Sequence, residues 1–272
     1  MFNRNELRFE RRSILTAAQL RAIEKFPREF LRLTFADFGD GILSVLDFVT
    51  RGKEIFLTAG VVKLGEKFFL ADETNLSTLI DGCDEGKRYR LVLGAPQRTA
   101  TEGVINEKIS LEVKPLDETC KGADFGRFKA GIVKLPDINA QDLFDEFTRR
   151  GSRLNLLHVP QAVRGGTTFH PTIFRAILSR LQHKENPSPA DVALMLRLAD
   201  GEPLSLPALK IFVECKSVKW SDAPPEEIFK SVIAAVDAVQ KTVPPAQVAK
   251  PEEAPAPKPD DDGGILITEV IS

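Results

Sequence analysis

Short apolar runs that end at glycine-containing turns fill the chain from Gly41 to Leu135. Apolar residues often recur at every second position in these runs, as they do in strands with one buried face. The turns at Gly52 and Gly65 separate neighbouring runs by only a few residues, which is typical of antiparallel hairpins. We therefore predict an antiparallel β domain over residues 41–136. Its expected strands are residues 42–50, 54–58, 61–64, 68–70, 89–93, 105–113 (with a bulge or an edge) and 128–135.

Apolar residues at helical spacing replace this pattern after residue 136. Asn139 is expected to cap a short helix, and Pro171 suits the first position of a longer one. Ser188 is the expected N-cap of the next helix, and a last helix is predicted to begin at Pro224. Residues 154–159 are the one additional strand expected here. Residues 137–243 are thus predicted to form a mainly helical domain.

Residues 1–40 are predicted to form an N-terminal arm with a short helix. Thr16 and Gln19 have the spacing of a capping box, in which the threonine hydroxyl caps the helix and the glutamine reaches back. Pro27 should end or kink this helix, and residues 30–35 should continue as extended chain or turn. The first 32 residues carry eight Arg or Lys against four Glu. We expect Arg8, Arg11 and Arg12 to help dock an acidic protein partner, with a solvated helix face as the alternative.

Proline and acidic residues dominate the composition after Val243. Residues 244–264 cannot bury a core and are predicted to be a linker. Residues 265–272 are strongly β-prone again, and we predict that they form a C-terminal docking strand. Its apolar residues are Ile265, Leu266, Ile267, Val270 and Ile271. The strand can complete the chain's own sheet or add to that of a neighbouring subunit, and the sequence leaves both possibilities open.

The predicted fold class is α+β: an N-terminal antiparallel β-rich domain followed by a helical domain and a tethered C-terminal strand. The composition is that of a soluble globular protein, and the net charge of −2 gives no strong attraction to nucleic acid or to a membrane. Three cysteines without a Cys-x-x-Cys pair argue against a disulfide scaffold and a zinc site. The charged N-terminus and the lack of a long apolar run predict a cytoplasmic protein, or one within an assembled particle.

Candidate catalytic residues do not form a known motif. The candidates are His158, His170, His183, Asp37, Asp40 and Asp47. The histidines are poorly spaced for one metal site, and aspartates close to hairpins are usually turn residues. We therefore predict no catalytic, cofactor-binding or metal site, and no enzymatic activity. An enzyme remains the alternative if the three aspartates converge with His158.

Three short motifs between residues 12 and 70 resemble a known family. The motifs are Ile14-Leu15-Thr16 with Gln19, Gly41-Ile42-Leu43, and Ala59-Gly60-Val61 with Gly65 and Phe68. This stretch resembles the N-terminal shoulder domain shared by baseplate adaptors of type VI secretion systems and receptor-binding proteins of some tailed phages. Asp40 stands where that family has a tryptophan, and the family's Pro-Asp before its turn is missing.

The resemblance implies a structural subunit of a phage-tail-like contractile machine, present in repeated copies and linking other baseplate or tail proteins. From the charge, the motifs and the apolar runs we also predict no cofactor, no nucleic-acid partner and no insertion into a membrane. Two alternatives remain open from the sequence: a cytosolic assembly chaperone, and a small enzyme or nucleic-acid-binding protein with an unfamiliar site.

Overall fold

The computed structural model describes residues 16–44, 46–101, 104–119, 123–131, 133–148, 153–201 and 203–238. The chain divides into two units, Met1–Val239 and Gln240–Ser272, and every described residue lies in the first unit. The predicted linker and C-terminal strand lie outside the described residues.

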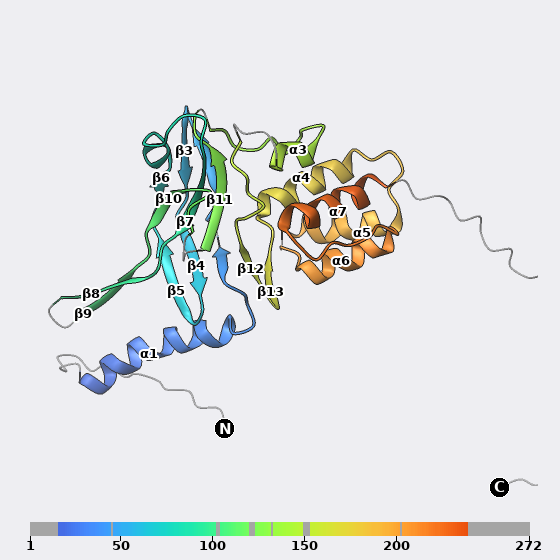
Figure 1. Ribbon diagram of the computed structural model, residues 1–272. Helices are drawn as coiled ribbons and strands as arrows, with labels where there is room; N and C mark the ends of the chain where they lie inside the picture. The colour runs from blue at the N-terminus through green and yellow to red at the C-terminus, as the bar shows by residue number, and fades with distance from the viewer. Residues whose placement is uncertain are drawn as a thin grey trace, which may run out of the picture. The chain divides into compact units, whose positions relative to one another are not determined.

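The largest sheet joins segments that are far apart in the sequence (Figure 1). Its strands, in spatial order, are β13 (Gly166–Thr168), β12 (Gln161–Val163), β1 (Gly41–Ser44), β4 (Gly60–Leu64) and β5 (Lys67–Ala71). β1 runs parallel to β12 through Ile42 and Gln161, and the other pairs in this sheet are antiparallel. Gly65 closes the β4–β5 hairpin with a φ of 59°, a conformation that favours glycine.

Smaller antiparallel sheets complete the β part of the unit. One contains β10 (Leu111–Pro115), β7 (Arg88–Leu93) and β11 (Ala123–Lys129); a second contains β2 (Phe48–Arg51), β3 (Glu54–Leu57) and β6 (Thr74–Asn75); a third contains β8 (Gln97–Thr101) and β9 (Val104–Lys108). The predicted strand 42–50 is therefore wrong as a single element, because the chain leaves one sheet after Ser44 and enters another at Phe48.

Gly60 makes this change of sheet possible. A Cβ at Gly60 would lie 2.6 Å from both the Leu46 nitrogen and the Ser44 oxygen, so only glycine lets the connection between β1 and β2 pass so close to β4.

Helices α4 to α7 lie together beside the sheets, with β12 and β13 between them and the other strands (Figure 1). The helices are α1 (Ala17–Thr34), α2 (Ser77–Ile80), α3 (Leu143–Thr148), α4 (Pro171–Gln182), α5 (Pro189–Ala199), α6 (Leu206–Cys215) and α7 (Pro225–Asp237). Ser188 caps α5 and Pro171 begins α4, so these two predictions are confirmed. Together with the antiparallel β-rich region that precedes them, these helices confirm the α+β fold class.

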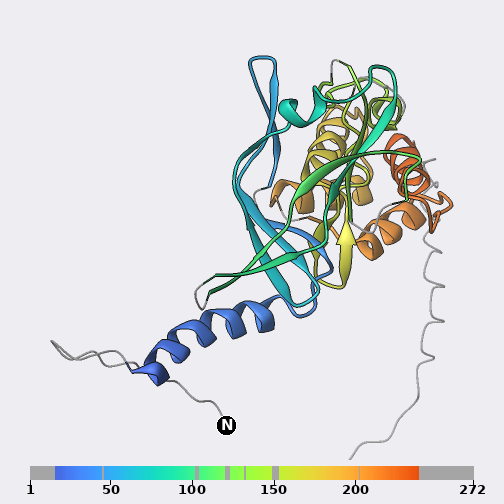
Figure 2. The same ribbon diagram turned by 60° about the vertical axis from the view of Figure 1, so that its left-hand side comes forward.

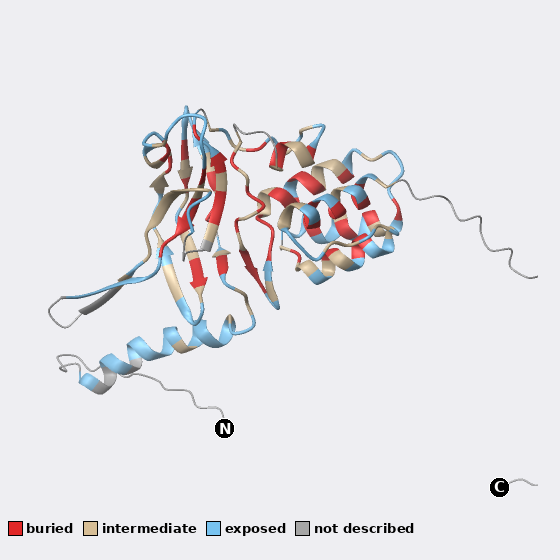
Figure 3. Ribbon diagram, viewed as in Figure 1, coloured by how far each residue is buried: buried red, intermediate tan, exposed pale blue. Residues whose placement is uncertain are grey.

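The strands and helices share one hydrophobic core (Figure 3). Fully buried side chains come from both parts, including Phe125 in β11, Ile177 in α4 and Phe229 in α7. Phe229 packs edge to face against Phe147 and Phe169, which join α3 and the end of β13 to the helices.

Other local predictions are also wrong, including the single strand 105–113, which is divided into β9 and β10 in two different sheets. α1 continues through Pro27 to Thr34, so the helix does not end at the proline and residues 30–34 are helical where extended chain or turn was expected. Asp142, not Asn139, accepts the backbone N–H of Asp145 in the first turn of α3. The predicted strands 128–135 and 154–159 are replaced by β11, which ends at residue 129, and by β12, which begins at residue 161.

Candidate functional site

The predicted interface residues lie outside the described part of the chain. They are Arg8, Arg11, Arg12, Ile265, Leu266, Ile267, Val270 and Ile271. Their assignment to an interface therefore stays a prediction.

The three candidate aspartates bind three different elements. The backbone carbonyl of Asp37 accepts the N–H of Gly165, and the Asp40 carboxylate accepts the N–H of Gly65 at 2.7 Å. Asp47 lies between β1 and β2, where its carboxylate forms an ion pair of 2.7 Å with Arg175 on α4. Because each aspartate stabilises a different turn or contact, the three do not form one carboxylate site.

His170 is a buried structural residue. Its ring accepts the N–H of Thr172 at the start of α4 and packs edge-on against Phe48, with the Asp47 carboxylate 3.8 Å away. Burial lowers the pKa of His170 to about 4, which outweighs the opposing effect of Asp47. The ring is therefore neutral near pH 7, and it caps α4 while filling the space between β2 and the helices.

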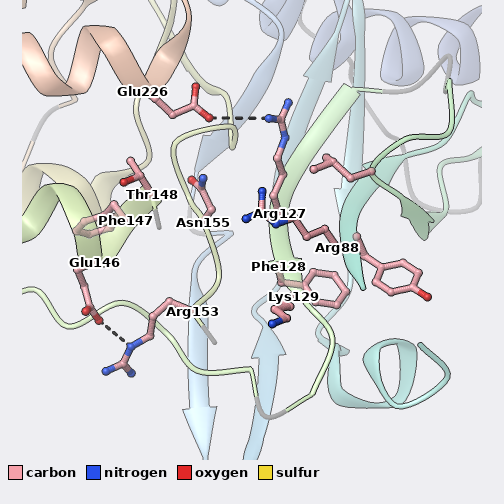
Figure 4. Close-up of a pocket in the computed structure, with 12 residues that line it drawn as sticks. Arg88, Arg127, Phe128, Lys129, Glu146, Phe147, Thr148, Arg153, Asn155 and Glu226 are labelled. Carbon is pink, nitrogen blue, oxygen red and sulfur yellow. Dashed lines mark ion pairs between the residues drawn. The ribbon is translucent and has the colours of Figure 1, made fainter. Parts of the chain in front are cut away.

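His158 pairs with Glu226 rather than with an aspartate. Its Nε2 lies 2.6 Å from the Glu226 carboxylate in the first turn of α7. Glu226 also lies 3.9 Å from Arg127 on β11 (Figure 4). Burial and the Arg127 charge lower the pKa of His158, although Glu226 opposes them. Burial raises the pKa of Glu226. The hydrogen bond from its own backbone N–H and the interaction with His158 together lower it by more, so this pKa falls below its usual value.

A small pocket lies next to this pair, between β11 and the helices α3 and α7 (Figure 4). On its other side Arg153 forms an ion pair of 2.8 Å with the buried Glu146. The two hydroxyls of the lining are engaged, since Thr148 donates to the Phe144 carbonyl and Tyr89 accepts from the Asp84 N–H.

The pocket volume of about 120 Å³ is below the roughly 300–1,000 Å³ of small-molecule sites. Two ion pairs, Arg127 with Glu226 and Arg153 with Glu146, line the pocket. This arrangement is suited to holding β11 against α3 and α7, and the volume leaves little room for a substrate.

A buried charge cluster at the start of α5 was missed by sequence reasoning. Asp191 is fully buried and accepts hydrogen bonds from the backbone and hydroxyl of Ser188 and from Lys216, the last at 2.8 Å. Lys184 lies 3.1 Å from the same carboxylate. Ser188 and Asp191, three residues apart, carry the signal of a capping box, but the two lysines come from other helices and cannot be identified from local spacing.

The exposed feature with the clearest chemistry is the apolar face of α1. Ile23, Phe26, Phe30 and Leu33 follow one another at intervals of three and four residues and are 44%, 72%, 58% and 68% exposed. The rings of Phe26 and Phe30 stack with centroids 6.2 Å apart. The ion pair between Glu24 and Arg28 lies on the opposite face.

Most of α1 extends beyond the sheet in both views (Figure 2). Its C-terminal end packs against the sheet: Phe35, directly after the helix, lies 6.0 Å from Phe68 in β5 between ring centroids. Sequence reasoning missed this face because Pro27 was expected to interrupt the helix.

No family model, curated protein or solved structure matches the chain. Within the described ranges, no group of three His, Cys, Asp or Glu side chains is placed to hold a metal ion. None of the helices in this part of the chain is both long enough and apolar enough to cross a membrane.

Proposed function

We propose that this protein is a non-enzymatic structural subunit that binds other proteins in the baseplate of a phage-tail-like contractile machine. The observation that carries the protein-binding part is the apolar face of α1. The contractile-machine part rests on the resemblance of residues 12–70. The expected partners are other baseplate or tail proteins, with the chain present in repeated copies.

Burial of the α1 face would contribute substantial binding energy. A fully buried Leu, Ile or Phe side chain contributes about 1.5–3 kcal/mol relative to its exposed state. Ile23, Phe26, Phe30 and Leu33 form a continuous stripe, and such stripes mark interaction sites more often than isolated apolar residues do. A partner that covers this stripe therefore gains several kcal/mol before the cost of association is counted.

Two of the three motifs that carry the resemblance fall on neighbouring strands. Gly41-Ile42-Leu43 begins β1, and the third motif begins β4 with Gly60-Val61 and reaches β5 with Phe68, so the second and third motifs lie on neighbouring strands of one sheet. This adjacency is what a shared local domain requires, and it supports the proposal without depending on α1.

The α1 face is tested by replacing Phe26 and Phe30 with glutamate in the full chain. The matched control reverses the charges on the opposite face, Glu24→Arg with Arg28→Glu, which keeps an ion pair at the same spacing. Both proteins are affinity-purified from the cell that produces them, and co-purifying proteins are quantified by mass spectrometry and sedimentation. We expect the control to sediment with tail or baseplate components in fixed stoichiometry, and the glutamate variant to sediment as an unassembled chain with an unchanged melting temperature.

Equal assembly of both variants would show that α1 is not the interface. The partners of the control could instead be unrelated to contractile tails and be lost in the glutamate variant. Protein binding by α1 would then stand, and the baseplate assignment would be rejected. A chaperone would bind free subunits and be absent from the finished particle.

A further inference from the structure

β5 is the outer strand of the five-stranded sheet, and none of the described strands pairs with its outer edge. Natural proteins usually protect such an edge with a bulge, a proline or inward-pointing charges. β5 has the sequence Lys-Phe-Phe-Leu-Ala and pairs with β4 in an unbroken register, so its only charge is at its first residue. Leu70 is 87% exposed. This edge is therefore open to pairing with a further strand.

The hairpin geometry determines which backbone groups of β5 face outward. A two-residue turn joins Leu64 to Lys67, so these two residues form the hydrogen-bonded pair that closes the hairpin. Hydrogen-bonded and non-hydrogen-bonded pairs alternate along an antiparallel ladder. Phe69 thus directs its backbone N–H and C=O to β4, whereas Phe68 and Leu70 direct theirs to the outer edge.

A β-hairpin arm lies beside this edge. β8 and β9 form a sheet of their own within the described part of the chain, and this sheet extends away from the other strands in both views (Figures 1 and 2). Lys67 at the start of β5 forms an ion pair of 2.7 Å with Glu107 in β9. A groove of about 540 Å³ is lined by residues 68–72 of the edge and residues 107–109 of the arm. Because a two-stranded ribbon is only marginally stable by itself, the arm also has the properties of a surface that a partner covers.

We propose that β5 pairs antiparallel with β5 of a second copy of this chain, about a two-fold axis at Phe69, so that the two five-stranded sheets become one. This register pairs all five residues of the strand and joins the outward backbone groups of Phe68 to those of Leu70 in the second copy. The directly opposed side chains are then Phe69 with Phe69, and Phe68 with Leu70. Every one of these contacts is apolar, and the exposed Leu70 is covered.

The charges at the ends of β5 favour a second copy in this orientation. Lys67 begins the strand, the exposed Asp72 follows its last residue, and only apolar side chains lie between them. Antiparallel pairing brings Lys67 of each copy to the end of the strand where Asp72 of the other lies, whereas parallel pairing would place like charges together. The strand therefore matches itself in charge and in apolar pattern, as a two-fold interface requires.

Sedimentation of the full chain over a concentration series tests the pairing. Every protein carries Phe26→Glu and Phe30→Glu, so that the α1 face does not contribute. Leu70→Pro removes an outward N–H from β5, and the matched control Thr167→Pro removes one from β13, the other outer strand of the same sheet. We expect the parent and the control to dimerise, and Leu70→Pro to dimerise at least about 100-fold more weakly, because two symmetric hydrogen bonds are lost.

A single cysteine traps the dimer without interrupting the strand. Phe69→Cys is introduced into the same background, with the chain's own cysteines replaced by serine. Residues at the two-fold axis form a non-hydrogen-bonded pair with Cα atoms about 4.5 Å apart, which is within disulfide reach. Mild oxidation should link two chains through position 69, whereas Thr167→Cys on β13 should give no such link.

Three results would each overturn the proposal. The first is a parent protein that stays monomeric throughout the concentration series, as it would if the edge were filled by the same chain or by a different protein. The second is a dimer that is equally strong in Leu70→Pro and in the control. The third is the absence of an interchain bond in Phe69→Cys. No readout involves α1, so each of these failures leaves the proposed function of the α1 face standing.

Discussion

The buried cluster around Asp191 gives the sharpest prediction about stability. Asp191 is fully buried at the start of α5, Lys216 is 3% exposed, and the two are 2.8 Å apart. Burial raises the pKa of Asp191, but hydrogen bonds from Lys216, Ser188 and Lys184 outweigh it, so the pKa is lowered. The cluster joins the ends of α4 and α6 to the first turn of α5, and its charges depend on one another.

The losses of the two single variants should not add up in the double variant. Asp191→Ala leaves Lys216 buried without its carboxylate, which costs about 3–5 kcal/mol, and removes half of the capping box, which costs about 1 kcal/mol. We expect a total loss of about 5 kcal/mol. Lys216→Met leaves Asp191 paired with Lys184 and should cost about 2 kcal/mol. The double variant should lose about 4 kcal/mol, because it contains no orphaned charge at position 216.

Guanidinium unfolding of the full chain at pH 7, followed by circular dichroism, measures all three variants. Lys210→Met is the matched control, because Lys210 is 44% exposed and lies 3.9 Å from the exposed Asp222. Its loss should be below about 0.5 kcal/mol. The reasoning is refuted if Asp191→Ala costs no more than this control, or if the two single losses simply add in the double variant.

Further predictions concern groups in the core and in one turn. The His170 ring should titrate near pH 4 by NMR, not near 6.5. Because the unfolded chain binds a proton on His170 at a higher pH than the folded protein does, the free energy of unfolding should fall by about 3 kcal/mol as the pH drops from 6.5 to 4. Phe125→Ala should cost about 4 kcal/mol in a denaturant titration, against less than about 0.5 for the exposed Phe26→Ala. Gly60→Ala should cost about 2 kcal/mol by the same assay, whereas Gly82→Ala, with open space around its Cα, should not destabilise.

Local signals in the sequence predicted those elements that are determined locally. The hairpins turning at Gly52 and Gly65 are present because each pairs strands only two residues apart, with glycine at a positive φ. The cap at Ser188 and the proline start of α4 are likewise set by the backbone chemistry of a few neighbouring residues. In each case the interaction that determines the structure joins residues that are close together in the sequence.

Elements that depend on distant partners could not be predicted in this way. β1 is paired with β12, more than a hundred residues later, and this pairing leaves no periodicity in either segment. α6 was missed although its start carries a local signal, since Ser205 accepts the N–H of Ala208 and a proline lies in its first turn. The α1 face was missed because Pro27 was expected to end the helix, whereas α1 continues to Thr34.

The pairing of β1 with β12 also determines how the molecule should unfold. Directly after β13, His170 caps α4 and contacts Phe48 in β2, while the Thr168 hydroxyl donates to the Leu204 carbonyl in the helical part. Sheet and helices therefore lie on one core within the unit Met1–Val239, and a loss at Asp191 should lower the stability of both. In the Asp191→Ala variant, Trp220 fluorescence from the helical side and exchange of the β7 amides from the sheet should report one shared transition. Two separate transitions would show that the buried charge cluster stabilises the helices alone.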